Sequence, residues 1–310
     1  MTERDASFRS ADGKTVPVCH WAQEGDIRGA VLLVHGMAEH AGRYERLACA
    51  LARDGLAVYA PDLRGHGRAI PEGVRGSLGP RNGWERALDD LLLLTDRMRS
   101  KHPGAPVFLF GHSMGSLFGR VLLMRHGERF AAAVLSGVFV DKPVRRTLAP
   151  LLASAAGLRR MEQPNRLLHS MTCGQYNKPF EGRTAHDWIS SIPEEVDRYT
   201  ADPLCGFVCS AALYRDIGVM LRDSLRSERI RGVPDGLPVL FTAGADDPLG
   251  GRAAVGFLIS SWRKHGKNAY GKVYPGCRHE VHSDVAAGEF ARDVRDFLLE
   301  ALRGGPAACK

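Results

Sequence analysis

The sequence predicts an α/β fold with a mostly parallel central sheet, flanking helices and a helical insertion. Short apolar runs alternate with amphipathic helical segments along most of the chain, which is typical of a parallel sheet covered by helices. The alternation stops near residue 138 and resumes near residue 237. Between these points the chain is helical, irregular and rich in Arg, Leu and Ser, with no convincing strand.

The first part of the chain contains six predicted strands. The N-terminal stretch alternates polar and apolar residues around Asp12-Gly13, a dipeptide that favours a hairpin turn between two strands. Further strands are predicted at 30–36, 56–62, 106–111 and 130–137, and helices at 45–55, 82–104 and 114–127. The insertion therefore follows the sixth strand.

After the insertion the alternation of strands and helices returns. Strands are predicted at 237–244 and 269–276, and helices at 252–266 and 283–305. The last helix places Phe290, Val294, Phe297 and Ala301 on one face. We expect a core made of residues 1–137 and 237–310, with residues 138–236 as a helical cap.

Composition and charge exclude several classes of protein. The chain has 310 residues, 44% of them hydrophobic and 25% charged, and no apolar run approaches the ~18 residues of a membrane span. No signal-peptide core precedes the first strand. Its formal charge is +7, but the arginines are spread along the chain, which argues against a nucleic-acid partner and favours a solvated basic surface over binding to anionic lipid. Seven scattered cysteines without a CxxC pair indicate a reducing, cytoplasmic setting.

Ser113 lies in the stretch Gly111-His112-Ser113-Met114-Gly115, between a predicted buried strand and a predicted helix. A nucleophilic serine at a sharp strand-to-helix turn needs this context, because flanking glycines leave room for a strained backbone. The alternative is a glycine-rich turn without chemistry. The strand before the serine and the helix after it favour the nucleophile.

A serine nucleophile needs a base and an acid that orients the base. The strand at 237–244 is followed by Asp246 and Asp247, and we favour Asp247 because Pro248 fixes the turn after it. The strand at 269–276 is followed by His279 and His282. We favour His279, because His282 is expected in or near the first turn of the last helix.

Backbone N–H groups are expected to bind the oxyanion that develops in such a reaction. One would come from Met114, the residue after the nucleophile, and the other from Met37, in the loop after the first buried strand. Gly36 would permit a sharp turn there, and both methionine side chains would line the acyl pocket. The string "HEVH" does not have the HExxH spacing of a zinc site, so we expect no metal and no cofactor.

With these residues in place, the chain resembles the serine α/β-hydrolases of the monoacylglycerol lipase and lysophospholipase group. The matching segments are "HGMAEHAGRYERLACAL", "APDLRGHG", "FGHSMGS", "GADDPLG" and "YPGCRHE", in family order between residues 35 and 280. The resemblance implies Ser113 as nucleophile, Asp247 as acid and His279 as base, with Met37 and Met114 as oxyanion donors. It also implies that the insertion caps the active site. Ser116, where many members have glycine, and the lack of serine after "GHG" depart from the family pattern.

The expected activity is hydrolysis of a carboxylic ester, most readily that of a monoacyl lipid such as a monoacylglycerol or lysophospholipid. A short-chain carboxylesterase or lactonase is the alternative within enzymes, and a non-catalytic binding protein is the alternative outside them. The segment "TLAPLLASAAGL" (147–158) is apolar enough to cover an acyl chain or to touch a membrane peripherally, although packing of the cap on the core is the favoured explanation. The cap matches the family least, so the resemblance leaves the natural ester open.

Overall fold

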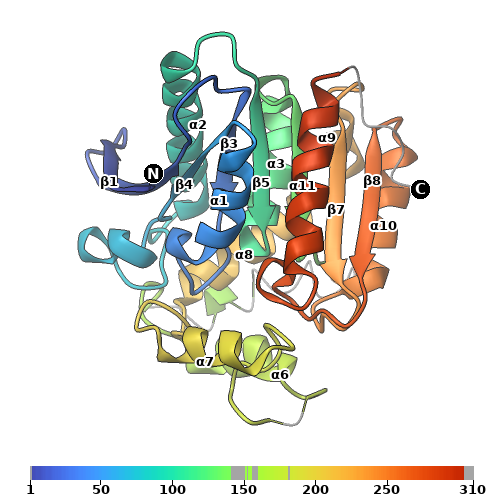
Figure 1. Cartoon of the computed structure of the whole chain (residues 1–310). Coiled ribbons are helices and arrows are strands. Elements are labelled where there is room, and N and C mark those ends of the chain that lie inside the picture. Colours follow the sequence, from blue (N-terminus) through green and yellow to red (C-terminus); the bar gives the residue numbers. More distant parts are fainter. Residues whose placement is uncertain (1, 141–150, 152, 156–159, 181, 304–310) are drawn as a thin grey trace.

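The computed structural model describes residues 2–140, 151, 153–155, 160–180 and 182–303. These residues form an eight-stranded sheet in the order β1-β2-β4-β3-β5-β6-β7-β8 (Figure 1). The strands are β1 Thr2–Arg9, β2 Thr15–Trp21, β3 Gly29–Val34, β4 Leu56–Pro61, β5 Val107–His112, β6 Ala132–Ser136, β7 Val239–Gly244 and β8 Ala269–Tyr274. Strands β3 to β8 run parallel, whereas β1 and β2 form the antiparallel N-terminal hairpin that the sequence predicts.

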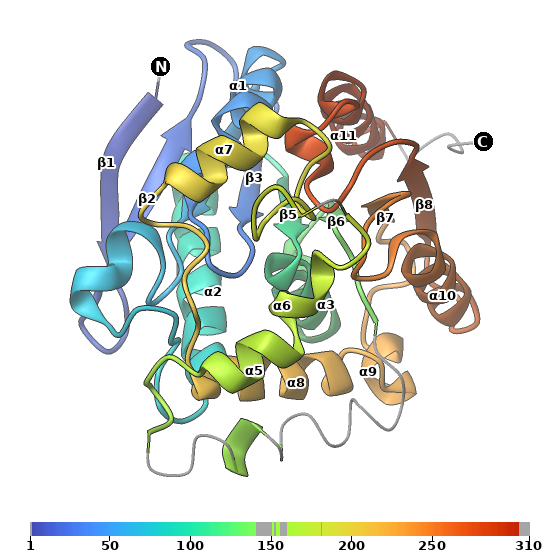
Figure 2. The same cartoon turned by 90° about the horizontal axis from the view of Figure 1, so that it is seen from below.

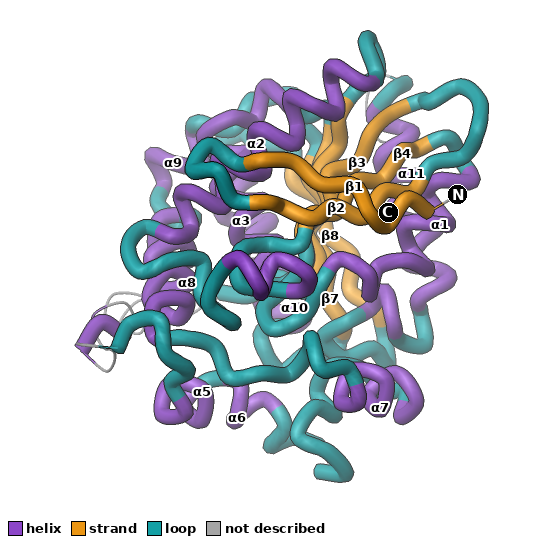
Figure 3. Tube along the Cα trace, turned by 90° about the vertical axis from the view of Figure 1, so that its left-hand side faces the viewer, coloured by secondary structure: helices purple, strands orange, loops and turns teal. Residues whose placement is uncertain are grey.

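Helices cover both faces of the sheet, which is why the central strands are apolar without alternation. Every residue of β3, β4, β5, β6 and β7 is buried. The covering helices are α1 Glu45–Arg53, α2 Gly83–Lys101, α3 Met114–His126, α10 Gly251–Arg263 and α11 Ala287–Ala301. Figure 3 shows α2 and α3 on one side of the strands and α1 and α11 on the other. Each layer buries a separate apolar cluster against the sheet.

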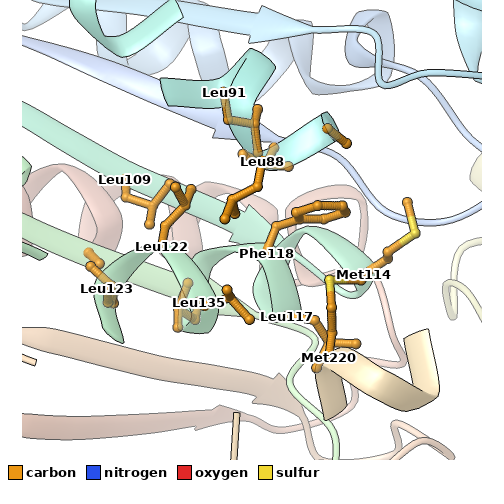
Figure 4. Close-up of a cluster of buried hydrophobic side chains, with 14 of the residues drawn as sticks. Leu88, Leu91, Leu109, Met114, Leu117, Phe118, Leu122, Leu123, Leu135 and Met220 are labelled. Atoms are coloured by element: carbon orange, nitrogen blue, oxygen red, sulfur yellow. The ribbon is translucent and has the colours of Figure 1, made fainter. Parts of the chain in front are cut away.

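The α3 helix lies in the centre of one of these clusters. Met114, Leu117, Phe118 and Leu122 pack among side chains from the sheet, α2 and α8 (Figure 4). One face of α3 is therefore anchored in an apolar cluster, and Ser113 directly precedes this helix.

The region predicted as an insertion is helical, and its helices serve two different layers. They are α5 Arg166–Met171, α6 Cys173–Tyr176, α7 Pro193–Ala201, α8 Ala211–Asp223 and α9 Ser227–Arg231. The helices α5, α6 and α7 lie beyond the carboxyl ends of the strands (Figures 1 and 2). In contrast, α8 packs against α2 and α3 and thus completes the helical layer of the core. The division at residues 137 and 237 stays a prediction, and most of the segment 147–158 lies outside the described residues.

Short 3-10 helices complete the secondary structure, at η1 Ala41–Tyr44, η2 Gly67–Glu72, η3 Gly127–Arg129 and η4 Val281–Ser283. The last of these corrects one prediction. The final helix begins at Ala287 and not at residue 283, because Val281–Ser283 forms its own turn and Asp284 is extended. In the part of the chain that the structure describes, none of the helices is both long and apolar enough to span a bilayer.

Candidate active site

Ser113 occupies the turn between β5 and α3, where the sequence predicts a nucleophile. Its backbone has φ +53° and ψ −115°, a conformation that residues with a side chain rarely adopt. The Ser113 N–H donates to the Ser136 carbonyl at 2.9 Å, and the Ser116 hydroxyl donates to the Ser113 carbonyl at 2.6 Å. The strain is therefore held by β6 on one side and by the first turn of α3 on the other.

The two glycines beside Ser113 are required by close packing. A Cβ on Gly111 would overlap the Gly115 carbonyl, and a Cβ on Gly115 would overlap the Val34 carbonyl. Neither glycine has a positive φ. Glycine at both positions thus lets β5, the turn and β3 approach one another closely, which is a requirement of the tight turn itself.

The three residues predicted as nucleophile, base and acid meet at the carboxyl edge of the sheet. The His279 Nε2 lies 2.8 Å from the Ser113 Oγ, and the His279 Nδ1 lies 2.9 Å from the Asp247 Oδ2. With the proton on Nδ1, His279 donates to Asp247 and accepts from the serine hydroxyl. His279 and Asp247 are buried, whereas Asp246 is exposed and takes no part in this chain of hydrogen bonds.

The electrostatics of His279 suit a general base. Burial lowers the pKa of His279, but the Asp247 carboxylate acts in the opposite direction through its charge and its hydrogen bond, and the net pKa is raised. The Leu249 N–H donates to the Asp247 Oδ1 at 2.9 Å, which fixes the carboxylate toward the imidazole. The arrangement can take a proton from Ser113 and hold it as imidazolium beside a carboxylate.

The predicted oxyanion donors, Met37 and Met114, both border the space above Ser113. Among the described residues, neither backbone N–H donates to another protein group, so both remain free for a ligand oxygen. In the loop after β3, the residue with a positive φ is Ala38, at +54°, and not Gly36, at which the sequence predicts the sharp turn. A Cβ on Gly36 would overlap the Glu39 carboxylate at 2.5 Å and would also lie 3.3 Å from the Ser113 Cβ, so glycine lets the loop approach both residues.

A buried ionic network of Glu39, Arg43 and Glu280 supports the loop after β3. The sequence analysis does not predict this network. The Glu39 carboxylate accepts from the Gly36 N–H at 2.6 Å, from the Tyr44 hydroxyl at 2.8 Å and from Arg43 at 2.9 Å. Arg43 also forms two hydrogen bonds of 2.6 Å with Glu280. Glu39 lies in the motif "HGMAEHAGRY", and Glu280 directly follows His279 in "YPGCRHE". Their places inside these motifs are the signal by which the sequence could have identified them.

His282, the alternative base, is kept away from Ser113. It lies in the 3-10 turn before the last helix, and its ring stacks on Tyr44 with centroids 4.4 Å apart. Among the described residues, neither of its ring nitrogens has a hydrogen-bond partner. Burial lowers the pKa of His282 to about 4, so this side chain is neutral and apolar in character near neutral pH.

A cavity of about 220 Å³ opens above Ser113. Its described lining comes mainly from two sources: the loops at the sheet edge and the segment 169–217. The second group comprises His169, Thr172, Cys173, Gly174, Tyr176, Asn177, Ala185, His186, Trp188, Tyr199, Gly206, Phe207, Tyr214 and Ile217. The sheet edge thus supplies Ser113, His279 and the loop with Met37, and the region predicted as an insertion, α8 included, supplies most of the described walls.

One segment of the insertion, residues 187–191, is hydrogen-bonded directly to the loop that carries His279. The His279 N–H donates to the Trp188 carbonyl at 3.3 Å, and the Glu280 N–H donates to the Ile189 carbonyl at 2.7 Å. The buried Asp284 carboxylate accepts from the Ser191 N–H and from the Ser191 hydroxyl, and also from the Arg278 N–H at 2.7 Å. The Trp188 ring lies 5.1 Å from the His279 ring. We call this set of contacts the histidine clip.

Two groups of described side chains have the residue types and spacing of a metal site, but each has a feature that disfavours a cation. Glu39, His112 and Glu280 place ligand atoms within 4.8 Å of one another, yet the Arg43 guanidinium already occupies both carboxylates. The other group is His40, Asp202 and Cys205, and burial raises the pKa of the Cys205 thiol. A thiol must lose its proton to bind a metal.

Known proteins resemble this chain in sequence and in fold. The model of the Hydrolase_4 family, described as serine aminopeptidase S33, matches residues 25–286. A monoacylglycerol lipase of Mycolicibacterium smegmatis is 31% identical over 97% of this chain and 99% of its own length. The human monoglyceride lipase is 31% identical over 89% of this chain and 83% of its own length.

Solved structures agree with these sequence matches. A carboxyl esterase of Bacillus coagulans, determined in complex with glycerol, superposes with a TM-score of 0.89 and 27% identity, covering 97% of this chain and 99% of that one. A monoglyceride lipase of Saccharomyces cerevisiae has the same fold, with a TM-score of 0.78, 20% identity, and coverage of 97% and 96%. The chain belongs to the Hydrolase_4 family, as an α/β-hydrolase of the monoacylglycerol lipase-like group.

Proposed function

We propose that this protein hydrolyses the carboxylic ester of a monoacyl lipid through an acyl-enzyme on Ser113. The hydrogen-bonded sequence Ser113–His279–Asp247 beneath an apolar cavity carries the proposal. The relatives named monoacylglycerol lipase support the lipid substrate, since they match this chain over nearly its whole length.

In the first half of the reaction, Ser113 attacks the ester carbonyl while His279 takes the hydroxyl proton. The Asp247 carboxylate stabilises the imidazolium that forms. The free N–H groups of Met37 and Met114 face the developing oxyanion, where one such donor contributes about 10²- to 10³-fold in rate. His279 then gives its proton to the leaving alcohol, and the acyl group stays on Ser113.

In the second half, His279 removes a proton from water, and the resulting hydroxide attacks the acyl-enzyme. Collapse of the tetrahedral intermediate breaks the Ser113–acyl bond, and His279 returns the proton to the serine oxygen. The products are a free carboxylic acid and the unchanged enzyme.

The test is a screen of monoacylglycerols, lysophospholipids and p-nitrophenyl esters, with Ser113→Ala as the control. We expect activity in the wild type, labelling of Ser113 by a fluorophosphonate probe, and loss of both in Ser113→Ala. A wild-type protein that stays unlabelled and inactive on all of these esters would instead support the non-catalytic binding protein.

A short-chain carboxylesterase is the second candidate, favoured by the similarity to the Bacillus coagulans carboxyl esterase. The two candidates differ in their dependence on acyl length. A lipid hydrolase is expected to gain activity as the chain lengthens and fills the apolar walls of the cavity. Highest activity on the shortest esters would support the carboxylesterase.

Peripheral contact with a lipid surface is part of the proposal. Three of the large apolar side chains that are exposed lie in the insertion, namely Leu151, Leu167 and Met171, with 64%, 62% and 57% of their surface accessible. Exposed apolar side chains on the region that supplies most of the cavity walls would insert into the interface of a vesicle or micelle.

A further inference from the structure

A second cavity, of about 360 Å³, lies next to the segment 187–191. Among the described residues, it shares no lining residue with the cavity above the candidate nucleophile, which we call the first cavity. Trp188 borders the first cavity, whereas its neighbour Asp187 borders the second. In the same way, His279 borders the first cavity and Arg278 borders the second. The two segments that the histidine clip joins therefore form a wall between the two cavities.

The guanidinium of Arg278 is anchored to this wall by one of its terminal nitrogens. Its Nη1 donates to the Asp187 carbonyl at 2.5 Å and to the Ser190 carbonyl at 3.1 Å. Its Cζ lies over the Phe180 ring, 4.1 Å from the ring centre. These contacts hold the guanidinium against the segment whose Trp188 carbonyl accepts from the catalytic histidine loop.

The opposite edge of the same guanidinium has no partner. Among the described residues, no group accepts from the Nε or the Nη2 of Arg278, and no carboxylate forms an ion pair with it. The side chain is only partly buried, so a ligand can reach these nitrogens. The N–H groups of Nε and Nη2 form a planar fork that matches the two oxygens of a carboxylate. The second cavity thus contains a cation with an unused bidentate donor.

The other charged side chains of the second cavity are already engaged. Arg183 forms an ion pair of 2.6 Å with Asp197. The Asp187 carboxylate accepts from the Thr184 N–H at 3.1 Å and from the Thr184 hydroxyl at 2.6 Å. Burial raises the pKa of Asp187, but the hydrogen bonds from Thr184 act against it and the net pKa is lowered, so this carboxyl is ionised near neutral pH. Its charge opposes an anionic ligand, and its removal should strengthen binding.

Apolar side chains border the rest of the second cavity, namely Pro179, Phe180, Pro193 and Val196. A hydrocarbon tail gains free energy in proportion to the apolar area that it buries on such a surface. A carboxylate with an apolar tail therefore satisfies both the free edge of the guanidinium and the apolar wall. A small inorganic anion satisfies only the guanidinium.

We infer that the second cavity binds an amphipathic carboxylate, with its oxygens on the free edge of Arg278 and its tail against Phe180 and Val196. Nη1 keeps its two bonds to the wall, because the ligand uses the other edge of the guanidinium. The ligand thereby stabilises the segment that accepts from the N–H groups of His279 and Glu280. The acid released by the proposed ester hydrolysis belongs to this chemical class. Its role as a feedback ligand rests on the proposed function, whereas the binding itself does not.

The test measures the binding of octanoate, below its micellar concentration, by isothermal titration calorimetry. Ser113 is first labelled with a long-chain fluorophosphonate, which occupies the first cavity and prevents binding there. We expect one saturable site for octanoate. Octanol lacks the charge and acetate lacks the tail, so each should bind at least about tenfold more weakly.

Three variants locate the site. Arg278→Gln removes the fork and should weaken octanoate binding by about tenfold or more. Arg183→Gln removes a guanidinium in the same cavity that is already paired, and it should keep the affinity within about twofold of the wild type. Asp187→Asn removes the opposing charge at nearly constant shape and should tighten binding a few-fold. Melting temperatures verify that each variant is folded, and the comparison of octanoate with octanol needs no variant.

Amide hydrogen exchange tests the coupling to the catalytic histidine. In the labelled protein, octanoate should slow the exchange of the His279 and Glu280 amides several-fold, because it stabilises the segment to which they donate. Octanol should leave their exchange unchanged. Octanoate binding without slower exchange would overturn the coupling.

Equal affinities for octanoate and octanol would overturn the inference and leave the proposed function intact. Equal affinities of the wild type and Arg278→Gln for octanoate would overturn it as well. Failure of Ser113 to react with the fluorophosphonate would overturn the proposed function instead. Octanoate would then be titrated into unlabelled protein, where the comparison with Arg278→Gln still tests the second cavity.

Discussion

Two parts of the insertion border the same cavity but are attached to the molecule in different ways. Residues 187–191 are joined to the His279 loop by the histidine clip, and Ile189 and Ser190 are fully buried. The segment that contains α5 and α6 contributes His169, Cys173 and Tyr176 to the cavity, but α5 exposes Leu167 and Met171 to solvent. The region predicted as an insertion is therefore hydrogen-bonded to the His279 loop at residues 187–191, whereas its helix α5 presents apolar side chains to solvent.

This difference separates two tasks. A catalytic base must be held in one geometry, because a misplacement of about 1 Å can cost about 10²-fold in rate. A surface that admits acyl chains needs apolar area more than fixed geometry. We expect changes on the clipped side to lower kcat, and changes in α5 to alter the use of long-chain substrates. The following predictions test that contrast, from the largest effect to the smallest.

The largest effect is expected at Asp247, the proposed acid that orients His279. Asp247→Asn would leave His279 with a poorer partner and favour the wrong tautomer, which lowers kcat by about 10³- to 10⁴-fold. The matched change Asp246→Asn, one residue earlier and exposed, should stay within about twofold of the wild type. Steady-state kinetics on a soluble ester measure both, and equal losses in the two variants would reject the assignment of Asp247.

The second prediction concerns how the free energy of unfolding falls in acid because of two buried histidines, His35 and His282. Burial lowers the pKa of His35 and of His282 to about 4, from an ordinary value of 6.5. The unfolded chain then binds more protons below pH 6.5, so folding stability is complete above that pH and is lost as the pH falls toward 4. Protonation of each histidine on unfolding can lower the free energy of unfolding by up to about 3 kcal/mol as the pH falls. His279 has a raised pKa and acts in the opposite sense.

Urea unfolding at pH 7, 6 and 5 measures this loss. The variant His282→Phe keeps the ring stacked on Tyr44 and removes the titration, and both histidine nitrogens lack a partner among the described residues. We expect a shallower dependence of the unfolding free energy on pH in this variant. A slope identical to that of the wild type would show that His282 does not contribute.

The third effect tests the histidine clip itself. Asp284→Asn weakens the bonds that join Ser191 to the Arg278 N–H, so His279 should sample more positions. We expect kcat to fall by about 10- to 100-fold with little change in KM. Ser191→Ala removes a single bond to the same carboxylate and should cause a smaller loss.

A merely structural role of Asp284 would lower the melting temperature without slowing the reaction of folded protein. The rate of Ser113 labelling by a small fluorophosphonate, measured well below the melting temperature, distinguishes the two. Unchanged labelling in Asp284→Asn would mean that the clip does not position His279.

The smallest effect is expected in α5. Replacing Leu167 and Met171 by serine should lower hydrolysis of long-chain esters in vesicles a few-fold, because about 25 cal/mol of binding is lost per Å² of apolar area. Hydrolysis of a soluble short ester should not change. Val285→Ser, an equally exposed apolar position beside the clip, is the control. Equal losses in both variants would assign no special role to α5.

Much of the fold and of the site could be predicted from the sequence because their signals are local. The central strands are continuous apolar runs, and the helices between them have clear apolar stripes. Ser113, Asp247 and His279 each follow such a strand. The carboxyl ends of parallel strands meet at one edge of a sheet, so these residues had to lie near one another, and the structure brings them within hydrogen-bonding distance.

Other features depend on contacts between segments that are far apart in the chain. Arg43 and Glu280 are separated by 237 positions and Ser191 and Asp284 by 93, so no spacing rule could pair them. The start of the last helix was misplaced for the same reason, since Asp284 holds the insertion and not the helix terminus. The helix α8 belongs to the core layer only because its apolar face meets α2 and α3.

The sequence by itself determined the places of the three candidate catalytic residues, because strand, turn and helix signals within a few residues put Ser113, Asp247 and His279 after the carboxyl ends of parallel strands. The tertiary structure decided the charge and the walls of the cavity. Arg43 binds two buried glutamates, Glu39 and Glu280, and packing alone determines that residues 187–191 contact the loop that carries His279. These contacts join segments that are distant in the chain, and their energies depend on burial that no local pattern encodes.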